Sequence, residues 1–228
     1  MIAVYPTAPV VPRNLLRLHF QFDEPMPEGA SRLVRIERAA TGAVLADALL
    51  PLEPELWDGT RRRLTVLLDP ARIKRGLVPH LEAGYPLTEG DDVRVVFAEH
   101  AVTYSVGPDL CRKVDPFSWR VAAPSIGSTD PIVVDFDRPF DVALLGACVR
   151  IAGVAGSAAI GEHETSWAFF PDEPWSTGVV HLEVEARLED VAGNSVARVF
   201  DRDLTDPDDD PIDIDAVSIP ITLERRVP

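Results

Sequence analysis

Cationic side chains gather in one short stretch of this sequence and are its first candidates for binding chemistry. The stretch spans 15 residues and contains Arg61, Arg62, Arg63, Arg72, Lys74 and Arg75, although the chain as a whole has a formal net charge of -15. The planar guanidinium group of arginine binds carboxylates and phosphates through paired hydrogen bonds. If the fold brings these side chains together, they form a site for an anion or an acidic partner. The alternative is a solvated strand face with internal salt bridges to Glu53, Glu55 and Asp58.

A second concentration of charge lies between Asp201 and Asp215, where eight of 15 residues are aspartates. Calcium takes about six to eight oxygen ligands. The candidate ligands are Asp206, Asp208, Asp210 and Asp213. The segment has no EF-hand glycine, and its two prolines suit an extended acidic linker equally well. Three interpretations therefore remain open: a calcium loop, a solvated acidic segment, and a segment that docks onto the basic residues.

Enzyme signatures are missing from the sequence. It contains no nucleophile elbow, phosphate loop, dinucleotide fingerprint or zinc-protease motif, and its histidines are scattered. His19 is expected on the wet face of a strand, without catalytic partners. Any catalytic or metal site would have to be assembled by the fold from distant residues.

Aromatic residues give a weaker indication of ligand binding. Trp57, Tyr85 and Trp175 lie in or beside predicted loops, where they could stack on a sugar ring or a peptide. A tryptophan buried in a sandwich core is the commoner arrangement, and we expect it for Trp119 and Trp167.

The elements that must position these residues are short β-strands. Alternation of apolar and polar residues in Leu16–Phe22 indicates a strand with one buried face, and the pattern recurs at Ile132–Phe136. Further strands are expected at 33–38, 44–52, 63–68, 93–97, 148–151, 166–170, 180–184, 196–200 and 217–223. Residues 71–88 form an insertion with one helical turn, and residues 99–116 connect the two halves. Pro220 predicts a sheet edge for the last strand.

Bulk properties agree with two folded domains. The chain has 228 residues, 46% of them hydrophobic, and its 21 prolines argue against long helices. We place the domains at 1–107 and 108–228.

The net charge argues against nucleic acid and anionic membranes as partners, and no apolar stretch reaches the length of a membrane span. Cys111 and Cys148 form no recognisable framework and are expected to be free.

Three motifs carry a family resemblance: F-x-x-P-M at Phe22–Met26, W-x-F-x-P at Trp167–Pro171 and L-E-D-x-A-G-N at Leu188–Asn194. Together they resemble bacterial Ig-like domains of the type first described in surface-layer proteins. The corresponding region of the first half, near Ala98–Thr103, lacks the Gly-Asn pair. The resemblance implies an all-β chain of two tandem Ig-like β-sandwich domains. It also implies an exported or envelope-associated protein that serves as a spacer, adhesion unit or surface-layer component, with no catalytic residues.

The sequence thus predicts a non-catalytic tandem module with a structural or protein-binding role. The alternative is a ligand-binding or enzymatic protein that uses the interdomain groove, with the basic residues as an anion-binding site. The expected partner is a protein or a small anionic ligand, without nucleic acid or membrane insertion, and calcium is the one candidate cofactor. The N-terminus lacks the features of a signal peptide, so we expect a cytoplasmic protein if Met1 is the native start.

Overall fold

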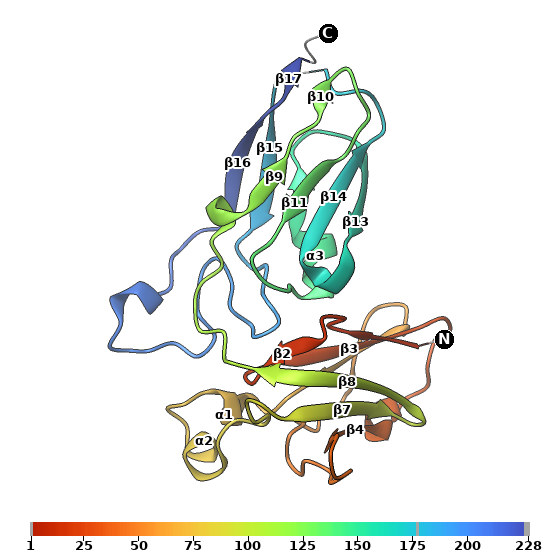
Figure 1. Ribbon diagram of the computed structural model, residues 1–228, viewed down its shortest axis with the longest axis vertical. Coiled ribbons are helices and arrows are strands. Elements are labelled where there is room, and N and C mark those ends of the chain that lie inside the picture. The colour runs from red at the N-terminus through yellow and green to blue at the C-terminus, as the bar shows by residue number, and fades with distance from the viewer. Residues whose placement is uncertain (1, 177, 226–228) are drawn as a thin grey trace. The chain divides into compact units, whose positions relative to one another are not determined.

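The computed structural model describes residues 2–176 and 178–225 and divides into two compact units (Figure 1). The first unit contains Met1–Cys111 together with two short pieces from late in the chain, Val191–Gly193 and Phe200–Asp203. The second unit contains Arg112–Asp190, Asn194–Val199 and Leu204–Pro228. Each unit surrounds its own apolar core with short strands, which confirms the prediction of a mostly β chain. Among the described residues, no helix has the length and apolar character needed to cross a membrane.

The first unit has two sheets of four strands, in the orders β1-β3-β6-β5 and β2-β8-β7-β4. Neighbouring strands are antiparallel except β2 and β8, which run parallel. Two short helices lie between β6 and β7, and a 3-10 turn precedes β4. The elements are β1 Ile2–Tyr5, β2 Val10–Pro12, β3 Arg17–Phe22, η1 Ala30–Leu33, β4 Val34–Arg38, β5 Leu56–Trp57, β6 Arg63–Leu67, α1 Pro70–Ile73, α2 Val78–Ala83, β7 Asp92–Phe97 and β8 His100–Gly107.

Strand β3 supplies the centre of this core. Leu18, Phe20 and Phe22 are buried, and the rings of Phe20 and Phe22 contact Phe97 with centroid separations of 5.6 and 5.2 Å. The prediction that His19 faces solvent is wrong, because only 4% of this residue is exposed. As a central strand, β3 has neighbours on both sides, and His19 Nδ1 lies 3.0 Å from the Thr65 hydroxyl of β6.

The second unit has sheets ordered β13-β14-β11-β9 and β12-β15-β16, and a parallel pair, β10-β17. Strand β16 lies at a sheet edge, as Pro220 predicts, and Pro220 is opposite His181. The elements are η2 Pro116–Ser118, β9 Arg120–Ala122, β10 Ser125–Ile126, β11 Ile132–Asp135, α3 Val142–Cys148, β12 Val149–Ile151, β13 Gly156–Ile160, η3 Glu162–Glu164, β14 Ser166–Pro171, β15 Val179–Glu185, η4 Pro207–Asp209, β16 Ala216–Thr222 and β17 Glu224–Arg225.

The two units share one pattern of strand pairing. The repeated sequence motif forms β3 in the first unit and β11 in the second. Strand β3 lies between β1 and β6, and β11 lies in the same way between β9 and β14. The other sheet contains β4-β7-β8 in the first unit and β12-β15-β16 in the second. In both, a short early strand pairs in parallel with the end of the unit, β2 with β8 and β10 with β17.

Four expectations for individual elements were wrong. Residues 44–52 make only isolated bridges, because this segment leaves β4 at Val44 and reaches the β6 side at Leu49. Residues 196–200 form no strand. The expected connection 99–116 contains β8, whose alternating Val102, Tyr104 and Val106 pack toward the core. The insertion holds two short helices rather than one turn, and α3 was not predicted.

Candidate functional site

The first three arginines of the basic cluster surround the turn between β5 and β6. Arg61 donates to the Met26 carbonyl at 3.0 Å and to Glu28 at 2.6 Å, and its guanidinium lies 5.3 Å from the centre of the Trp57 ring. Arg62 lies 3.7 Å from a carboxylate oxygen of Glu24. Asp58 shapes the turn by accepting hydrogen bonds from two successive backbone N–H groups, those of Arg62 and Arg63.

The other three cationic residues hold the insertion in place. Arg72 donates to four backbone carbonyls, at distances of 2.7 to 3.2 Å: those of Asp47, Ala83, Gly84 and Tyr85. Three of these follow or end α2, so the guanidinium group satisfies carbonyls that a helix end leaves without partners. Its hydrogen-bonding capacity is therefore used within the protein.

Arg75 contacts Asp201, the first residue of the acidic segment, and Lys74 contacts Phe200, the residue before it. Arg75 Nε donates to Asp201 Oδ2 at 2.6 Å, and its backbone N–H donates to Oδ1 at 3.1 Å. The hydrogen bond to Asp201 is the main reason why the pKa of Arg75 is raised. Lys74 Nζ lies 4.8 Å from the centre of the Phe200 ring. The hypothesis that the acidic segment docks onto the basic residues therefore fits Asp201, which binds Arg75.

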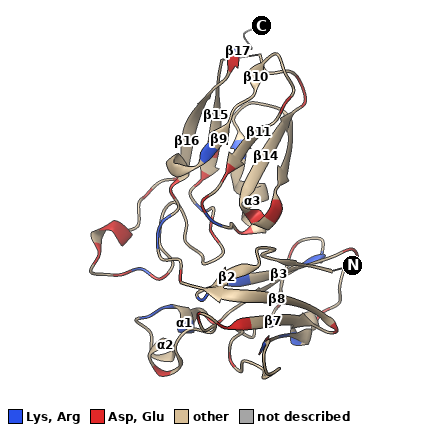
Figure 2. Cartoon of the chain, in the orientation of Figure 1, with Lys and Arg blue, Asp and Glu red and all other residues tan. Residues whose placement is uncertain are grey.

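The six cationic residues do not form one patch. Arg61–Arg63 lie at the start of β6, whereas Arg72–Arg75 follow its end. Since a strand rises about 3.3 Å per residue, roughly 15–20 Å separate the two groups. Figure 2 shows Lys and Arg distributed over many elements of the chain. The acids named as salt-bridge partners also bind elsewhere, since Glu53 pairs with Arg32 and Glu55 accepts backbone N–H groups.

The acidic segment is largely exposed beyond Asp201. Asp206 accepts the Asp208 N–H at 3.0 Å and so caps η4, and Lys113 Nζ donates to the Asp210 carbonyl at 2.5 Å. Among residues 2–176 and 178–225, no group of three or more His, Cys, Asp or Glu side chains is arranged to hold a metal ion. The calcium candidates Asp206, Asp208, Asp210 and Asp213 are therefore not brought together as a ligand set.

A polar cluster that the sequence did not predict centres on Asp109. Its carboxylate accepts hydrogen bonds from Arg13 at 3.0 Å, Tyr85 at 3.1 Å and the Cys111 thiol at 3.4 Å. The His80 ring packs edge-on against Tyr85, with centroids 4.7 Å apart. These residues come from three distant segments, so no local motif could have indicated the cluster.

The electrostatics of this cluster oppose nucleophilic chemistry. Burial and the neighbouring Asp109 carboxylate raise the pKa of Cys111 to about 12, and the same two causes raise the pKa of Tyr85 to about 12. A reactive cysteine needs positive surroundings that favour the thiolate. Here the nearest acceptor is negative and stabilises the protonated thiol. The cluster therefore fixes the chain that follows β8 rather than activating a nucleophile. Both cysteines are free, as predicted.

The aromatic candidates are also held by internal contacts. Trp175 is buried and donates from Nε1 to the Asp130 carbonyl at 2.9 Å. Its ring is therefore not exposed for stacking on a ligand. Trp57 is half-buried and donates to Glu55 at 2.8 Å. Trp119 and Trp167 are core residues, as predicted.

The L-E-D-x-A-G-N motif forms a buried hydrogen-bonded turn. Asp190 is fully buried and accepts the Asn194 backbone N–H at 3.0 Å, the Asn194 amide, and Arg138 Nη1 at 3.0 Å. Burial raises the pKa of Asp190, and the contacts with Asn194 and Arg138 act in the opposite direction. Gly193 has φ +84, and an added Cβ would lie 2.5 Å from Leu16. The motif is therefore required by backbone geometry and buried hydrogen bonds.

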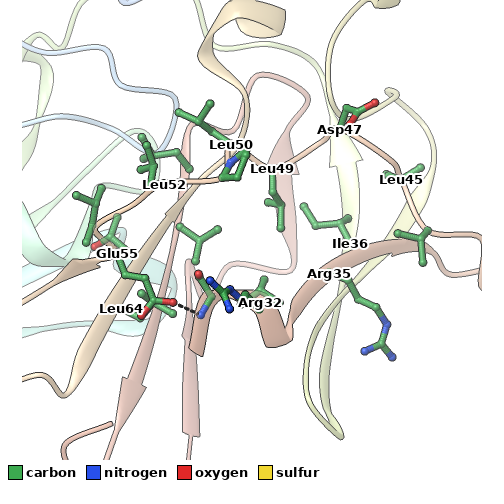
Figure 3. Close-up of a pocket in the computed structure, with 18 of the residues that line it drawn as sticks. Arg32, Arg35, Ile36, Leu45, Asp47, Leu49, Leu50, Leu52, Glu55 and Leu64 are labelled. Atoms are coloured by element: carbon green, nitrogen blue, oxygen red, sulfur yellow. Dashed lines mark hydrogen bonds between the residues drawn. The ribbon is translucent and has the colours of Figure 1, made fainter. Parts of the chain in front are cut away.

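One hollow in the first unit has the character of a small-molecule or side-chain pocket. It has a volume of about 350 Å³ and lies under the segment that crosses from β4 to β6. Leucines dominate its wall: Leu45, Leu49, Leu50, Leu52, Leu56, Leu64 and Leu67. Figure 3 shows several of these around the space, with Arg35 directed away from them. Mostly apolar hollows of this size fall at the lower end of the range for ligand sites.

One of the charged residues that line this pocket, Glu55, has a structural role. Oε2 accepts the Gly29 N–H at 3.0 Å and the Trp57 indole at 2.8 Å, and Oε1 accepts the Ser31 N–H at 2.7 Å. Partial burial opposes ionisation, but these donors more than compensate and lower the pKa of Glu55 to about 2. Its carboxylate is therefore occupied in anchoring η1.

Comparison with known proteins adds little. No protein-family model matches the chain, and no curated protein matches its sequence significantly. One solved structure with some similarity is described as the crystal structure of a mouse coronavirus receptor-binding domain complexed with its murine receptor. The match covers 81% of this chain and 90% of that chain, at 10% identity and a TM-score of 0.18. So weak a likeness shows neither the fold nor the function of this chain.

Proposed function

We propose that the chain is a pair of tandem Ig-like β-sandwich domains, acting as a non-catalytic structural or protein-binding module of an exported or envelope protein. The supporting observation is the strand order. In Ig-like sandwiches one sheet has the order A-B-E-D and the other C-F-G. The sheets β1-β3-β6-β5 and β4-β7-β8 follow this order, as do β9-β11-β14-β13 and β12-β15-β16.

Parallel pairing at the ends of each unit supports a role under tension. Strand β2 lies near the start of the first unit and β8 near its end, so a force that pulls these ends apart loads their shared hydrogen bonds along the strands. Two of these bonds are Ser105 N–H to the Pro9 carbonyl at 2.9 Å and Arg13 N–H to the Gly107 carbonyl at 3.0 Å. Strands β10 and β17 have the same relation in the second unit. Breaking several such bonds together requires more force than breaking them singly.

Single-molecule stretching of the full chain tests this proposal. We expect two unfolding events, one for each unit. Replacing Ser105 by proline removes a β2–β8 donor without removing a β7–β8 donor, so the first unit should open at lower force. Ser105→Ala is the matched control, because it keeps the N–H while deleting the hydroxyl contact with Asp92. Equal opening forces for the two variants would contradict the structural role. Fractionation of the source cells tests export separately.

A further inference from the structure

Strand β13, Gly156–Ile160, forms an open sheet edge in the second unit. Within the described part of the chain, it pairs with β14 on one side and has no strand on the other. Helix α3 lies beside it, yet residues 156–159 remain exposed. The strand contains neither charge nor proline, although these are the usual devices that protect a sheet edge from pairing.

The register determines which backbone groups point outward. Hydrogen bonds to β14 flank the strand, from Gly161 N–H to the Ser166 carbonyl at 2.9 Å and from Asp172 N–H to the Ala155 carbonyl at 3.0 Å. Because antiparallel pairs alternate between bonded and non-bonded, the odd-numbered residues of β13 face β14. The N–H and C=O groups of Gly156, Ala158 and Ile160 therefore point away from the sheet. Opposite Gly156 lies Pro171, which has no N–H to donate.

The outer face beside this edge offers an apolar contact. Ser157 is directly opposite Phe170, and 43% of Phe170 is exposed. Ala159 is opposite Ala168. Because the two residues on β13 are small, a side chain on an added strand could extend across them toward the Phe170 ring.

Charge around the edge is negative. No Lys or Arg occurs between Arg150 and Arg187. Glu162 follows one end of β13, and Asp172 and Glu173 adjoin the other. A hollow of about 570 Å³ at that second end is lined by both of these acids and by Ala155, the residue before β13. A strand continuing past Gly156 would bring a long cationic side chain to this hollow.

We infer that β13 accepts an extended, basic peptide segment of a partner protein as an added strand. Backbone groups of Gly156, Ala158 and Ile160 supply the hydrogen bonds, and the flanking acids select lysine or arginine at the ends of the segment. A second copy of this chain is disfavoured, since it brings another net charge of -15 and places like charges together. The inference specifies the partner within the proposed protein-binding role and rests on it.

Amide hydrogen exchange of the free protein tests the geometry first. Ser157 and Ala159 N–H groups should exchange slowly and those of Gly156 and Ala158 rapidly. Addition of a short peptide of alternating valine and threonine, with lysine at both ends, should slow the second set. The reverse pattern in the free protein, or no slowing with peptide, would overturn the inference.

A substitution tests the edge itself. Ala158→Pro removes an outward donor without removing a β14 ladder bond, so it should weaken peptide binding about tenfold while leaving the unfolding temperature nearly unchanged. Ala158→Ser is the control and should bind like the parent. The same peptide with glutamate at both ends should bind at least about tenfold more weakly at low salt, with a smaller difference at high salt.

Three results would refute the inference: equal binding by the two variants, equal binding of the two peptides, or self-association that Ala158→Pro abolishes, which would identify a second copy as the occupant. None of these bears on the stretching experiment, which measures the end strands. Equal opening forces for Ser105→Pro and Ser105→Ala, with peptide binding intact, would instead refute the structural part of the proposed function.

Discussion

The carboxylate of Glu55 provides a sharp quantitative prediction. It receives three hydrogen bonds from groups on η1, its preceding glycine and β5, so its removal should loosen the wall of the leucine-lined pocket. In Glu55→Gln the charge is lost and the amide can no longer accept at both positions. Glu55→Asp keeps the charge but shortens the side chain, and it serves as the comparison.

The expected magnitude follows from the pKa of Glu55, which falls from 4.5 to about 2. A shift of this size corresponds to about 3 kcal/mol of preferential stabilisation of the charged form. Because the side chain is partly exposed, screening reduces the expected contribution to about 1–2 kcal/mol. A lowered carboxyl pKa stabilises the folded state above the unfolded pKa of 4.5, and this stability is lost as the pH falls toward 2.

Two measurements test this reasoning. The Trp57 indole N–H donates directly to Glu55, so its NMR shift should titrate with a midpoint near 2. Denaturation of the parent and Glu55→Gln, followed through this same signal, should show a difference of about 1–2 kcal/mol near pH 6 that disappears toward pH 2. A midpoint near 4.5, or a difference independent of pH, would refute the assigned role.

Three further predictions concern the other clusters. Asp190→Ala removes the buried acceptor shared by Arg138 and Asn194, although Arg138 keeps its ion pair with Asp137. The second unit should lose about 2–4 kcal/mol of stability, measured by hydrogen exchange, and a loss below about 1 kcal/mol would contradict the buried pair. At pH 8, Cys111 should react with iodoacetamide far more slowly than a cysteine in an unstructured peptide, because its pKa is raised. Asp109→Asn should increase this rate by lowering the pKa of the Cys111 thiol. A fast reaction in the parent protein would count against the cluster. Arg72→Glu should lower the unfolding temperature, because four backbone carbonyls lose their donor. A chelator should leave the unfolding temperature of the parent protein unchanged, and stabilisation by added calcium would restore the hypothesis of a calcium-binding acidic loop.

Several features of the fold could be predicted from local sequence. Alternation identified β3 and β11, and Pro220 indicated an edge strand, because side-chain period and a missing donor act within a few residues. Residues 44–52 were misassigned because an apolar run looks the same whether it pairs or crosses between sheets. Strand β8 was overlooked because the turn at Ala98 and Glu99 carries no Gly or Pro, although Ala98 adopts φ 50.

The candidate sites depended on contacts that no local pattern contains. The sequence by itself determined the charge clusters, the repeated strand and the scarcity of cations between Arg150 and Arg187. The tertiary structure alone decided that Arg72 binds carbonyls, that Asp109 gathers residues from distant segments, and that β13 pairs on one side only among the residues described. Charge and periodicity are local properties of the chain, whereas partner choice depends on which distant segments the sheets bring within hydrogen-bonding distance.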